Sequence, residues 1–342
     1  MVSKHLLRFS HISPQEKTEG GSRIKASKLN FPVLDGVSIY KLNLVRGGVR
    51  EPHWHANADE LGYCIKGQVL VSLYHTMDTK ATFLVKEGEM FYIPSGALHY
   101  IENVSEVDAE MILYFTHQEP EDFGLSSAFG MFTDSVLANT WQQDASVFKH
   151  LKRSLKPSFA TINSHPSSIL DQYLYPSPYH FKIEDARPIL FCEGGSAHMA
   201  RHNFWPILKQ QSLYSLRLTK TGMREPHWHP ETSELGYVKK GRGRMSILNP
   251  QGNIDTYIMQ EGDIYFIPKA YPHHIENLED DILHLLIFFD QNMPKDVGFT
   301  GSVRSFPDGA LASSIQTNLD FVKKLPKYFS DLFIVNKLNP QD

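Results

Sequence analysis

The chain has 342 residues, of which 41% are hydrophobic and 21% charged, and its formal net charge at pH 7 is −4. This composition is typical of a folded globular protein and excludes extended disorder, and the length predicts two domains of roughly 150 residues each. Because no long basic run occurs, we expect neither nucleic acid nor a membrane as a partner. A small molecule is the expected ligand.

The first 21 residues lack the apolar core of about 7–15 residues that a secretory signal peptide requires. The most apolar stretch, residues 282–289, contains His284 and is far shorter than the roughly 20 residues that cross a bilayer. The chain has two cysteines, Cys64 and Cys192, which indicates a reducing compartment more than a disulfide scaffold. We therefore expect the protein in the cytoplasm.

The sequence repeats itself at an offset of 174 residues. Glu-Gly-Gly-Ser at 19–22 recurs at 193–196, and Arg-Glu-Pro-His-Trp-His at 50–55 recurs at 224–229. The register then holds without a gap from about residue 19 to 151 and from 193 to 325. We predict two similar domains, 1–160 and 161–342, with the boundary inside a proline- and serine-rich connector.

Within the first copy, residues 38–44, 69–74 and 82–85 alternate apolar and polar side chains at several positions, which predicts strands. Glycines separate these short strands, so a sandwich or barrel is expected. After Asp134 and after Asp308 the apolar spacing becomes helical, and Asp134 is the expected N-cap. The predicted fold class is all-β dominated, with two tandem barrels that each end in short helices.

Histidines and a glutamate form a set that occurs once in each copy. His53 and His55 are two residues apart, so on a strand their imidazoles project from the same face. Glu60 and His99 complete the first set, and the second contains His227, His229, Glu234 and His273 at the same spacing. Three imidazoles and a carboxylate partly neutralise a divalent cation and leave coordination positions open. The alternative, histidines that only line a core, is disfavoured because the pattern occurs twice.

Two segments of each copy carry a resemblance to a known family. RGGVREPHWHANADELGYCIKG with EGEMFYIPSGALHYIEN, and KTGMREPHWHPETSELGYVKKG with EGDIYFIPKAYPHHIEN, resemble the two cupin motifs. The tandem arrangement is most similar to the bicupin oxalate decarboxylases, which implies two double-stranded β-helix (jelly-roll) barrels. The resemblance implies one divalent transition metal per domain, with manganese expected and iron, nickel or zinc as alternatives. It assigns the two sets above as ligands, with His273 in preference to His274.

The same resemblance gives Arg50 and Arg224 the role of holding a substrate carboxylate, a task that suits a guanidinium group. Strict strand alternation would place Glu51, and not Arg50, on the face of His53. Arg50 therefore reaches the site only if Pro52 interrupts the alternation. The alternative role for each arginine is a surface ion pair.

The resemblance fails at the lid that follows the first barrel. Oxalate decarboxylases carry a proton-relaying glutamate there, and this chain has Leu125 at the aligned position, while the second copy has no glutamate in its corresponding stretch, which includes Phe299. Asp122 and Asp296 are equivalent residues in the two loops and are the candidates to replace the missing acid. Their alternative role is to anchor a turn.

From these residues we expect a metal-dependent enzyme that acts on a small carboxylate, with oxalate as the first substrate to test. It would be a lyase of the decarboxylase type or an oxidoreductase. The alternatives are a dioxygenase, oxidase or isomerase acting on another organic acid, with dioxygen as a second substrate, and a non-enzymatic storage or ligand-binding bicupin. The completeness of both ligand sets favours the enzyme. Cupins often associate into homo-oligomers, which the resemblance allows here.

Overall fold

The computed structural model describes residues 3–76, 79–165 and 167–339 and divides into two compact units. We call Ile12–Lys182 the N-terminal barrel. The C-terminal barrel is formed by the chain from Ile183 onward together with the segment that ends at His11. Among the described residues, no helix is both long enough and apolar enough to span a membrane.

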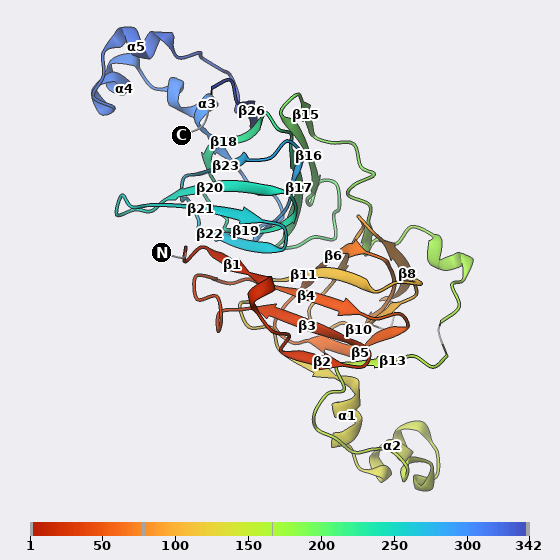
Figure 1. The fold of residues 1–342 in the computed structure, drawn as a ribbon. Helices are drawn as coiled ribbons and strands as arrows, with labels where there is room; N and C mark the ends of the chain where they lie inside the picture. Colours follow the sequence, from red (N-terminus) through yellow and green to blue (C-terminus); the bar gives the residue numbers. More distant parts are fainter. Residues whose placement is uncertain (1–2, 77–78, 166, 340–342) are drawn as a thin grey trace. The chain divides into compact units, whose positions relative to one another are not determined.

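The N-terminal barrel consists of two antiparallel sheets (Figure 1). In spatial order the first sheet contains β14 (His180–Phe181), β9 (Met90–Ile93), β6 (Glu60–Lys66), β11 (Ala109–Phe115), β4 (Ser38–Leu44), β3 (Gly21–Ala26) and β2 (Glu16–Thr18). The second contains β12 (Asp122–Gly124), β5 (Gly48–His55), β10 (Leu98–Asn103), β7 (Gln68–Thr76) and β8 (Thr79–Lys86), and β13 (Ala160–Ile162) also pairs with β5.

The C-terminal barrel repeats this topology. Its first sheet contains β1 (Leu6–Arg8), β22 (Asp263–Ile267), β19 (Glu234–Lys240), β24 (Leu283–Phe289), β17 (Ser212–Leu218), β16 (Gly195–Ala200) and β15 (Leu190–Cys192). The second contains β21 (Ile254–Gln260), β20 (Arg242–Leu248), β23 (His273–Asn277), β18 (Gly222–Trp228) and β25 (Val297–Gly298), and β26 (Ile334–Asn336) also pairs with β18. The predicted fold class is confirmed.

Short helices follow each barrel, as predicted. They are α1 (Leu125–Met131) and α2 (Asp134–Trp141) in the first copy, and α3 (Phe299–Ser302), α4 (Asp308–Ser314) and α5 (Leu319–Lys324) in the second. Single 3₁₀ turns are η1 (Phe9–His11), η2 (Ala145–Phe148), η3 (Asp171–Leu174) and η4 (Val303–Ser305). The N-cap of α2 is Thr133, whose hydroxyl accepts the N–H of Val136, and Asp134 lies in the first turn, so the N-cap prediction was wrong by one residue.

Each barrel receives a closing strand from outside its repeat. In the N-terminal barrel, β14 pairs with β9 through His180 and Phe91. In the C-terminal barrel, β1 takes the equivalent place, where Leu6 pairs with Tyr265. The sequence placed the domain boundary after residue 160, whereas the compact units divide after Lys182, because β13 and β14 both pair with strands of the N-terminal barrel.

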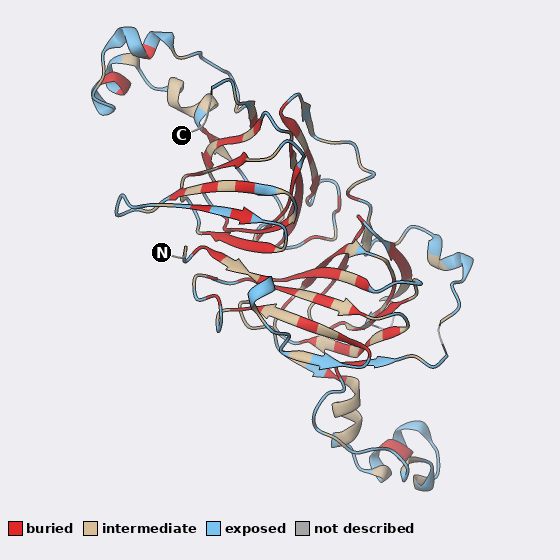
Figure 2. Cartoon of the chain, in the orientation of Figure 1, coloured by how far each residue is buried: buried red, intermediate tan, exposed pale blue. Residues whose placement is uncertain are grey.

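The lumen of each barrel is filled by alternate residues of its strands. Val71, Phe83 and Met111 are fully buried in the N-terminal core, and their equivalents in the second core are Met245, Tyr257 and Leu285. Figure 2 shows that the strands hold most buried residues, whereas α2 is largely exposed. Burial of one phenylalanine contributes about 2 kcal/mol, so the strands supply most of the stability.

A buried histidine on β24 is specific to the C-terminal barrel. The Nε2 atom of His284 lies 2.8 Å from the hydroxyl of Ser215 and 3.7 Å from a carboxylate oxygen of Glu184. Burial, followed by the charge of Arg217, lowers the pKa of His284 to about 3, although Glu184 opposes the shift. Lys239 and His198 act in the same direction as Arg217.

This histidine predicts an acid-dependent loss of stability. The pKa of His284 is lower in the folded protein than in the unfolded chain, where it is about 6.5. The contribution of neutral His284 to the free energy of unfolding is therefore complete above pH 6.5 and is lost as the pH falls from there toward 3. We expect the free energy of unfolding to fall less between pH 7 and pH 5 for His284→Gln than for the unmodified protein. Urea unfolding at several pH values measures this, and the exposed His150→Gln is the control. An equal fall in the free energy of unfolding for His284→Gln and the unmodified protein would contradict this role of His284.

Candidate metal centre

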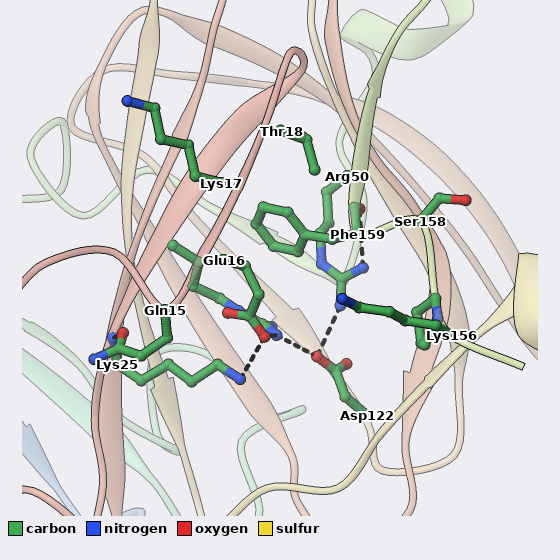
Figure 3. A pocket seen from close by; sticks show the side chains of 12 residues that line it. Gln15, Glu16, Lys17, Thr18, Lys25, Arg50, Asp122, Lys156, Ser158 and Phe159 are labelled. Atoms are coloured by element: carbon green, nitrogen blue, oxygen red, sulfur yellow. Dashed lines mark hydrogen bonds and ion pairs between the residues drawn. The ribbon is translucent and has the colours of Figure 1, made fainter.

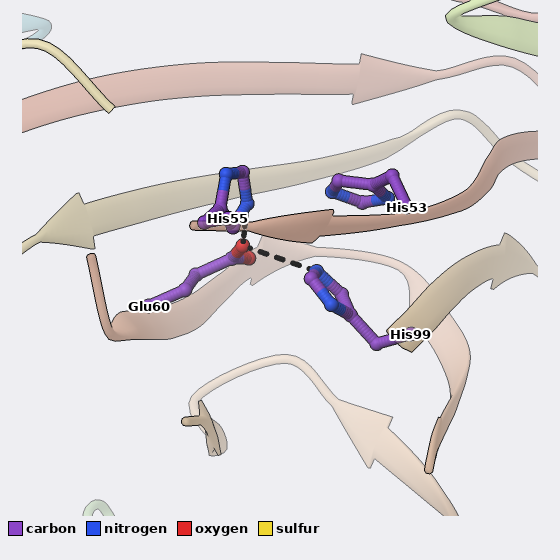
Figure 4. A group of neighbouring side chains, drawn as sticks. All are labelled: His53, His55, Glu60 and His99. Atoms are coloured by element: carbon purple, nitrogen blue, oxygen red, sulfur yellow. Dashed lines mark hydrogen bonds and ion pairs between the residues drawn. The ribbon is translucent and has the colours of Figure 1, made fainter. Parts of the chain in front are cut away.

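The predicted ligand set of the N-terminal barrel comes together inside the lumen. His53 and His55 project from β5, Glu60 begins β6 and His99 lies on β10 (Figure 4). One nitrogen or oxygen atom from each lies within 4.8 Å of those from the other three, and all four side chains are buried. The C-terminal barrel brings together the corresponding residues His227, His229, Glu234 and His273 in the same way.

The glutamate is the centre of each group. Oε2 of Glu60 lies 3.0 Å from Nε2 of His55 and 3.3 Å from Nε2 of His99. In the second group the corresponding distances from Oε2 of Glu234 are 2.9 Å and 3.4 Å. The two groups therefore have nearly the same geometry.

Backbone carbonyl groups orient the imidazoles. Nδ1 of His53 lies 2.8 Å from the carbonyl oxygen of Glu51, and Nδ1 of His99 lies 2.8 Å from that of Ala97. The second group repeats these contacts, His227 with Glu225 and His273 with Tyr271. A histidine that donates Nδ1–H to a carbonyl keeps the lone pair of Nε2 for a metal. Nε2 of His99 and of His273, and Oε1 of Glu60, are buried with no hydrogen-bond partner among the described residues, which fits a cation between them.

An irregular step in β5 brings Arg50 to the same side as the histidines. His53 pairs with His99, but Arg50 pairs with Ile101, so two residues of β5, Glu51 and Pro52, stand opposite one residue of β10, Tyr100. This bulge includes Pro52, and it is the interruption that the sequence required for Arg50 to reach the site. In the second barrel, β18 has the same step between Arg224 and His227.

Asp122 connects Arg50 to the histidines. Its Oδ2 accepts a hydrogen bond from Arg50 at 2.9 Å and forms an ion pair with Arg23 at 2.7 Å. Its Oδ1 lies 3.4 Å from Nδ1 of His55 and 3.9 Å from Nε2 of His53. The strand pairing explains this position, because β12 places Asp122 opposite His55. The structure therefore brings both candidate residues, Arg50 and Asp122, to the ligand group.

Electrostatics keep this cluster in defined charge states. Burial alone would raise the pKa of Asp122, but Arg50 and Arg23 hold it well below its ordinary value. Burial also opposes ionisation of Glu60, yet the neighbouring imidazoles of His55 and His99 lower its pKa to about 2. Burial, followed by the charge of Arg50, lowers the pKa of His53 well below 6.5. Neutral imidazole and ionised carboxylate are the forms that ligate metals.

The second barrel has the same Arg–Asp–His network with one arginine fewer. Arg224 donates to Oδ2 of Asp296 at 2.8 Å, and Oδ1 of Asp296 lies 2.6 Å from Nδ1 of His229. The position equivalent to Arg23 is Ala197. Arg23 was not singled out in the sequence, because an arginine present in one copy only has no motif to mark it.

The comparisons with known proteins agree with this geometry. The family model described as Cupin matches residues 8–148 and 181–322, which is most of the chain and both barrels. The chain belongs to the cupin family.

This bicupin is similar to several oxalate decarboxylases. It is 27% identical over 331 residues to oxalate decarboxylase OxdC of Bacillus subtilis, covering 94% of this chain and 85% of that protein. A probable oxalate decarboxylase of Arthroderma benhamiae is 26% identical over 312 residues, covering 87% and 75%. A solved structure of the Bacillus subtilis enzyme, a protein with Mn(II) centres, aligns with a TM-score of 0.88 at 25% identity, covering 98% of this chain and 90% of that chain. The resemblance stated from the sequence is confirmed.

The two centres of this bicupin differ in how the glutamate is held. The hydroxyl of Tyr265 donates to Oε1 of Glu234 at 2.8 Å, whereas the equivalent of Tyr265 in the first barrel is Phe91. Both rings pack on a glycine of the Glu-Leu-Gly-Tyr segment, and a Cβ atom added there would lie about 2 Å from the ring, at Gly62 against Phe91 and at Gly236 against Tyr265. Sequence reasoning missed Tyr265, although a comparison of the two copies at this position could have found it.

A second pair of glutamates binds the backbone of the segments that follow β12 and β25. The carboxylate of Glu51 accepts the N–H of Ser126, at the start of α1, at 3.0 Å and the N–H of Phe159 at 2.8 Å. Glu225 accepts the equivalent bonds from Thr300 and Phe333. The bulge that turns Arg50 inward thus leaves Glu51 to anchor the start of α1 and the segment that precedes β13. Leu125 and Phe299 begin α1 and α3, beside these anchors.

The tyrosine contact predicts unequal metal affinity in the two barrels. Partners that orient a ligating side chain typically contribute about 10- to 100-fold to metal affinity. We expect Tyr265→Phe to weaken manganese binding by the C-terminal group about tenfold, and to leave the N-terminal group unchanged. Competition titration with a metal indicator dye measures both. Tyr257→Phe removes a buried hydroxyl that has no hydrogen-bond partner among the described residues and is the matched control.

Proposed function

We propose that this bicupin is a metal-dependent enzyme that acts on a small carboxylate, with one divalent ion in each barrel and oxalate as the leading substrate. The observation that carries the proposal is the combination of a complete ligand group and an Arg–Asp pair in both barrels. A storage or structural cupin needs no arginine beside its metal. In each pair the arginine is nevertheless buried, and the partly buried aspartate lies against a ligand histidine.

Manganese is the proposed ion. Three imidazoles and one carboxylate also suit iron, nickel and zinc, so the ligand types alone do not select the metal. The support for manganese is the likeness to the Bacillus subtilis oxalate decarboxylase, which has Mn(II) centres. His53, His55, Glu60 and His99 would hold the first ion, and His227, His229, Glu234 and His273 the second.

The chain's own residues would bind and orient the substrate. A bound divalent ion supplies a Lewis acid that polarises a coordinated carboxylate. Arg50 has five N–H donors, of which the Phe159 carbonyl and Asp122 take one each, so others remain to grip a second carboxylate oxygen. Oδ1 of Asp122 is buried with no hydrogen-bond partner among the described residues and can accept a hydrogen bond from the bound substrate at that oxygen. In the second barrel Arg224 and Asp296 would have these roles.

An oxidoreductase reaction on a small acid is the second candidate, and the lid favours it. The aligned position of the family's proton-relaying glutamate is Leu125, and its equivalent Phe299 is 43% exposed at the start of α3. Asp122 is engaged by two arginines through Oδ2. A decarboxylase that releases formate needs a proton donor at the reacting carbon, and an oxidase does not. The two reactions therefore differ in product.

Metal analysis tests the ligand assignment. We expect the purified chain to hold manganese or another transition metal in both barrels, and His99→Ala and His273→Ala each to lose the ion of one barrel only, because each variant removes one of four ligands. Mass spectrometry of the metal content measures this. The exposed His150→Ala is the control. Only traces of metal in the unmodified chain would remove the basis of the enzyme proposal and favour a non-enzymatic bicupin.

Product analysis tests the reaction. With oxalate under air, we expect little formate, because Leu125 cannot donate a proton. Leu125→Glu should raise formate production on the order of 10²-fold, which is the lower range for a positioned general acid. Formate, carbon dioxide and peroxide are followed together, and Leu125→Gln controls for side-chain size and polarity. Abundant formate from the unmodified chain would show that another group, such as Asp122, supplies the proton.

A further inference from the structure

A cavity of about 500 Å³ lies on the N-terminal barrel beside the Arg50–Asp122 pair (Figure 3). Its walls come from β2, β3, Arg50 of β5 and the segment 156–159. Pockets for small-molecule ligands are commonly about 300–1,000 Å³, so this one is large enough for a complete small molecule. The metal centre does not account for it.

Basic side chains dominate the cavity. Its lining contains five, Lys17, Arg23, Lys25, Arg50 and Lys156, against two acidic ones, Glu16 and Asp122. Both acidic side chains already form ion pairs with basic residues of the lining. Asp122 binds the two arginines, and Glu16 binds Arg23 at 2.9 Å and Lys25 at 2.6 Å. Within the described parts of the chain, no ion pair joins Lys17 or Lys156 to an acid, so the cavity retains uncompensated positive charge.

The two arginines of the cavity are held in place before any ligand arrives. Arg23 and Arg50 are each 3% exposed, and both guanidinium groups lie 5.1 Å from the ring centroid of Phe159. Arg50 also donates to the carbonyl oxygen of Phe159 at 3.1 Å. Donors fixed in this way lose little conformational entropy when they bind an anion.

The C-terminal barrel provides an internal comparison. The pair Arg224–Asp296 is retained there, but the other four basic positions are apolar or neutral: Phe191, Ala197, Met199 and Ser330 stand at the positions of Lys17, Arg23, Lys25 and Lys156. The same backbone topology therefore forms without these charges. Concentrating like charges around a cavity is electrostatically unfavourable without a ligand, so the fold does not explain them.

We propose that the N-terminal barrel binds a small polyanion in this cavity, a molecule with two or more carboxylate or phosphate groups, and that the C-terminal barrel does not. The anionic groups lie against Arg50 and Lys156, beside the first metal centre. The site shares Arg50 with the proposed substrate site and in this respect rests on the proposed function, but binding of the anion requires no bound metal. It makes the two barrels different in ligand as well as in sequence.

Calorimetric titration of the full-length chain tests this site, with tricarballylate and pyrophosphate as the probes. We expect saturable binding of one of them at one site per chain, weakened by added sodium chloride because salt screens charge. The stronger probe identifies whether carboxylate or phosphate is the preferred group. We expect Lys156→Ser, which introduces the residue of the second copy, to weaken binding about five- to tenfold, the effect of losing one charge-assisted contact.

Lys220→Ser is the matched control, since it removes an exposed lysine of the C-terminal barrel that pairs with Asp280, and we expect no change in affinity. Lys25→Met, the second substitution toward the other copy, should also weaken binding and serves if Lys156→Ser fails to fold. Titration is repeated after metal removal by a chelator and dialysis, with unchanged affinity expected. The proposal would be overturned if neither probe saturated the protein by about 10 mM. It would also be overturned if Lys156→Ser or Lys25→Met bound the probe as tightly as the unmodified chain, or if binding were lost when the metal was removed.

Discussion

The bulge in β5 is the constraint on which the site depends. A regular strand would place Arg50 and His53 on opposite faces, and one extra residue at Glu51–Pro52 puts both inside the barrel. The same step leaves Glu51 free to bind the backbone of α1 and of the segment that returns to the barrel. A single irregularity thus positions the ligand histidine, the arginine and the glutamate that binds the start of the following helix, and the second copy repeats all three.

The sequence predicted the elements whose signal is local or repeated. Spacing along one strand determines which side chains share a face, so His53 and His55 were found directly, and duplication supplied Glu60 and His99. The closing strands were not predicted, because β1 and β14 span three and two residues and pair with strands far away in the chain. Such short segments carry no periodicity. Contacts such as Tyr265 with Glu234 also depend on pairing register, which spacing alone does not specify.

The two barrels keep the same ligands and differ in what surrounds them. Glu234 is held by Tyr265, whereas the equivalent oxygen of Glu60 has no hydrogen-bond partner among the described residues. Asp122 binds two arginines, and Asp296 binds one in addition to His229. Groups that contact the ligands tune a metal's reactivity and access, so the two centres of one chain are chemically distinct despite a common scaffold.

The position of β1 makes the N-terminal barrel an insertion within the C-terminal unit. Pairing of β1 with β22 joins residues 255 to 259 positions apart, and the entropy lost in closing a loop grows with its length. If the N-terminal barrel has already folded, most of that intervening chain is no longer free. Contacts between distant residues also slow folding. This topology therefore favours an order of folding in which the inserted N-terminal barrel folds first. The edge of the C-terminal barrel at β22 is then completed by β1, although β1 precedes both barrels in the chain.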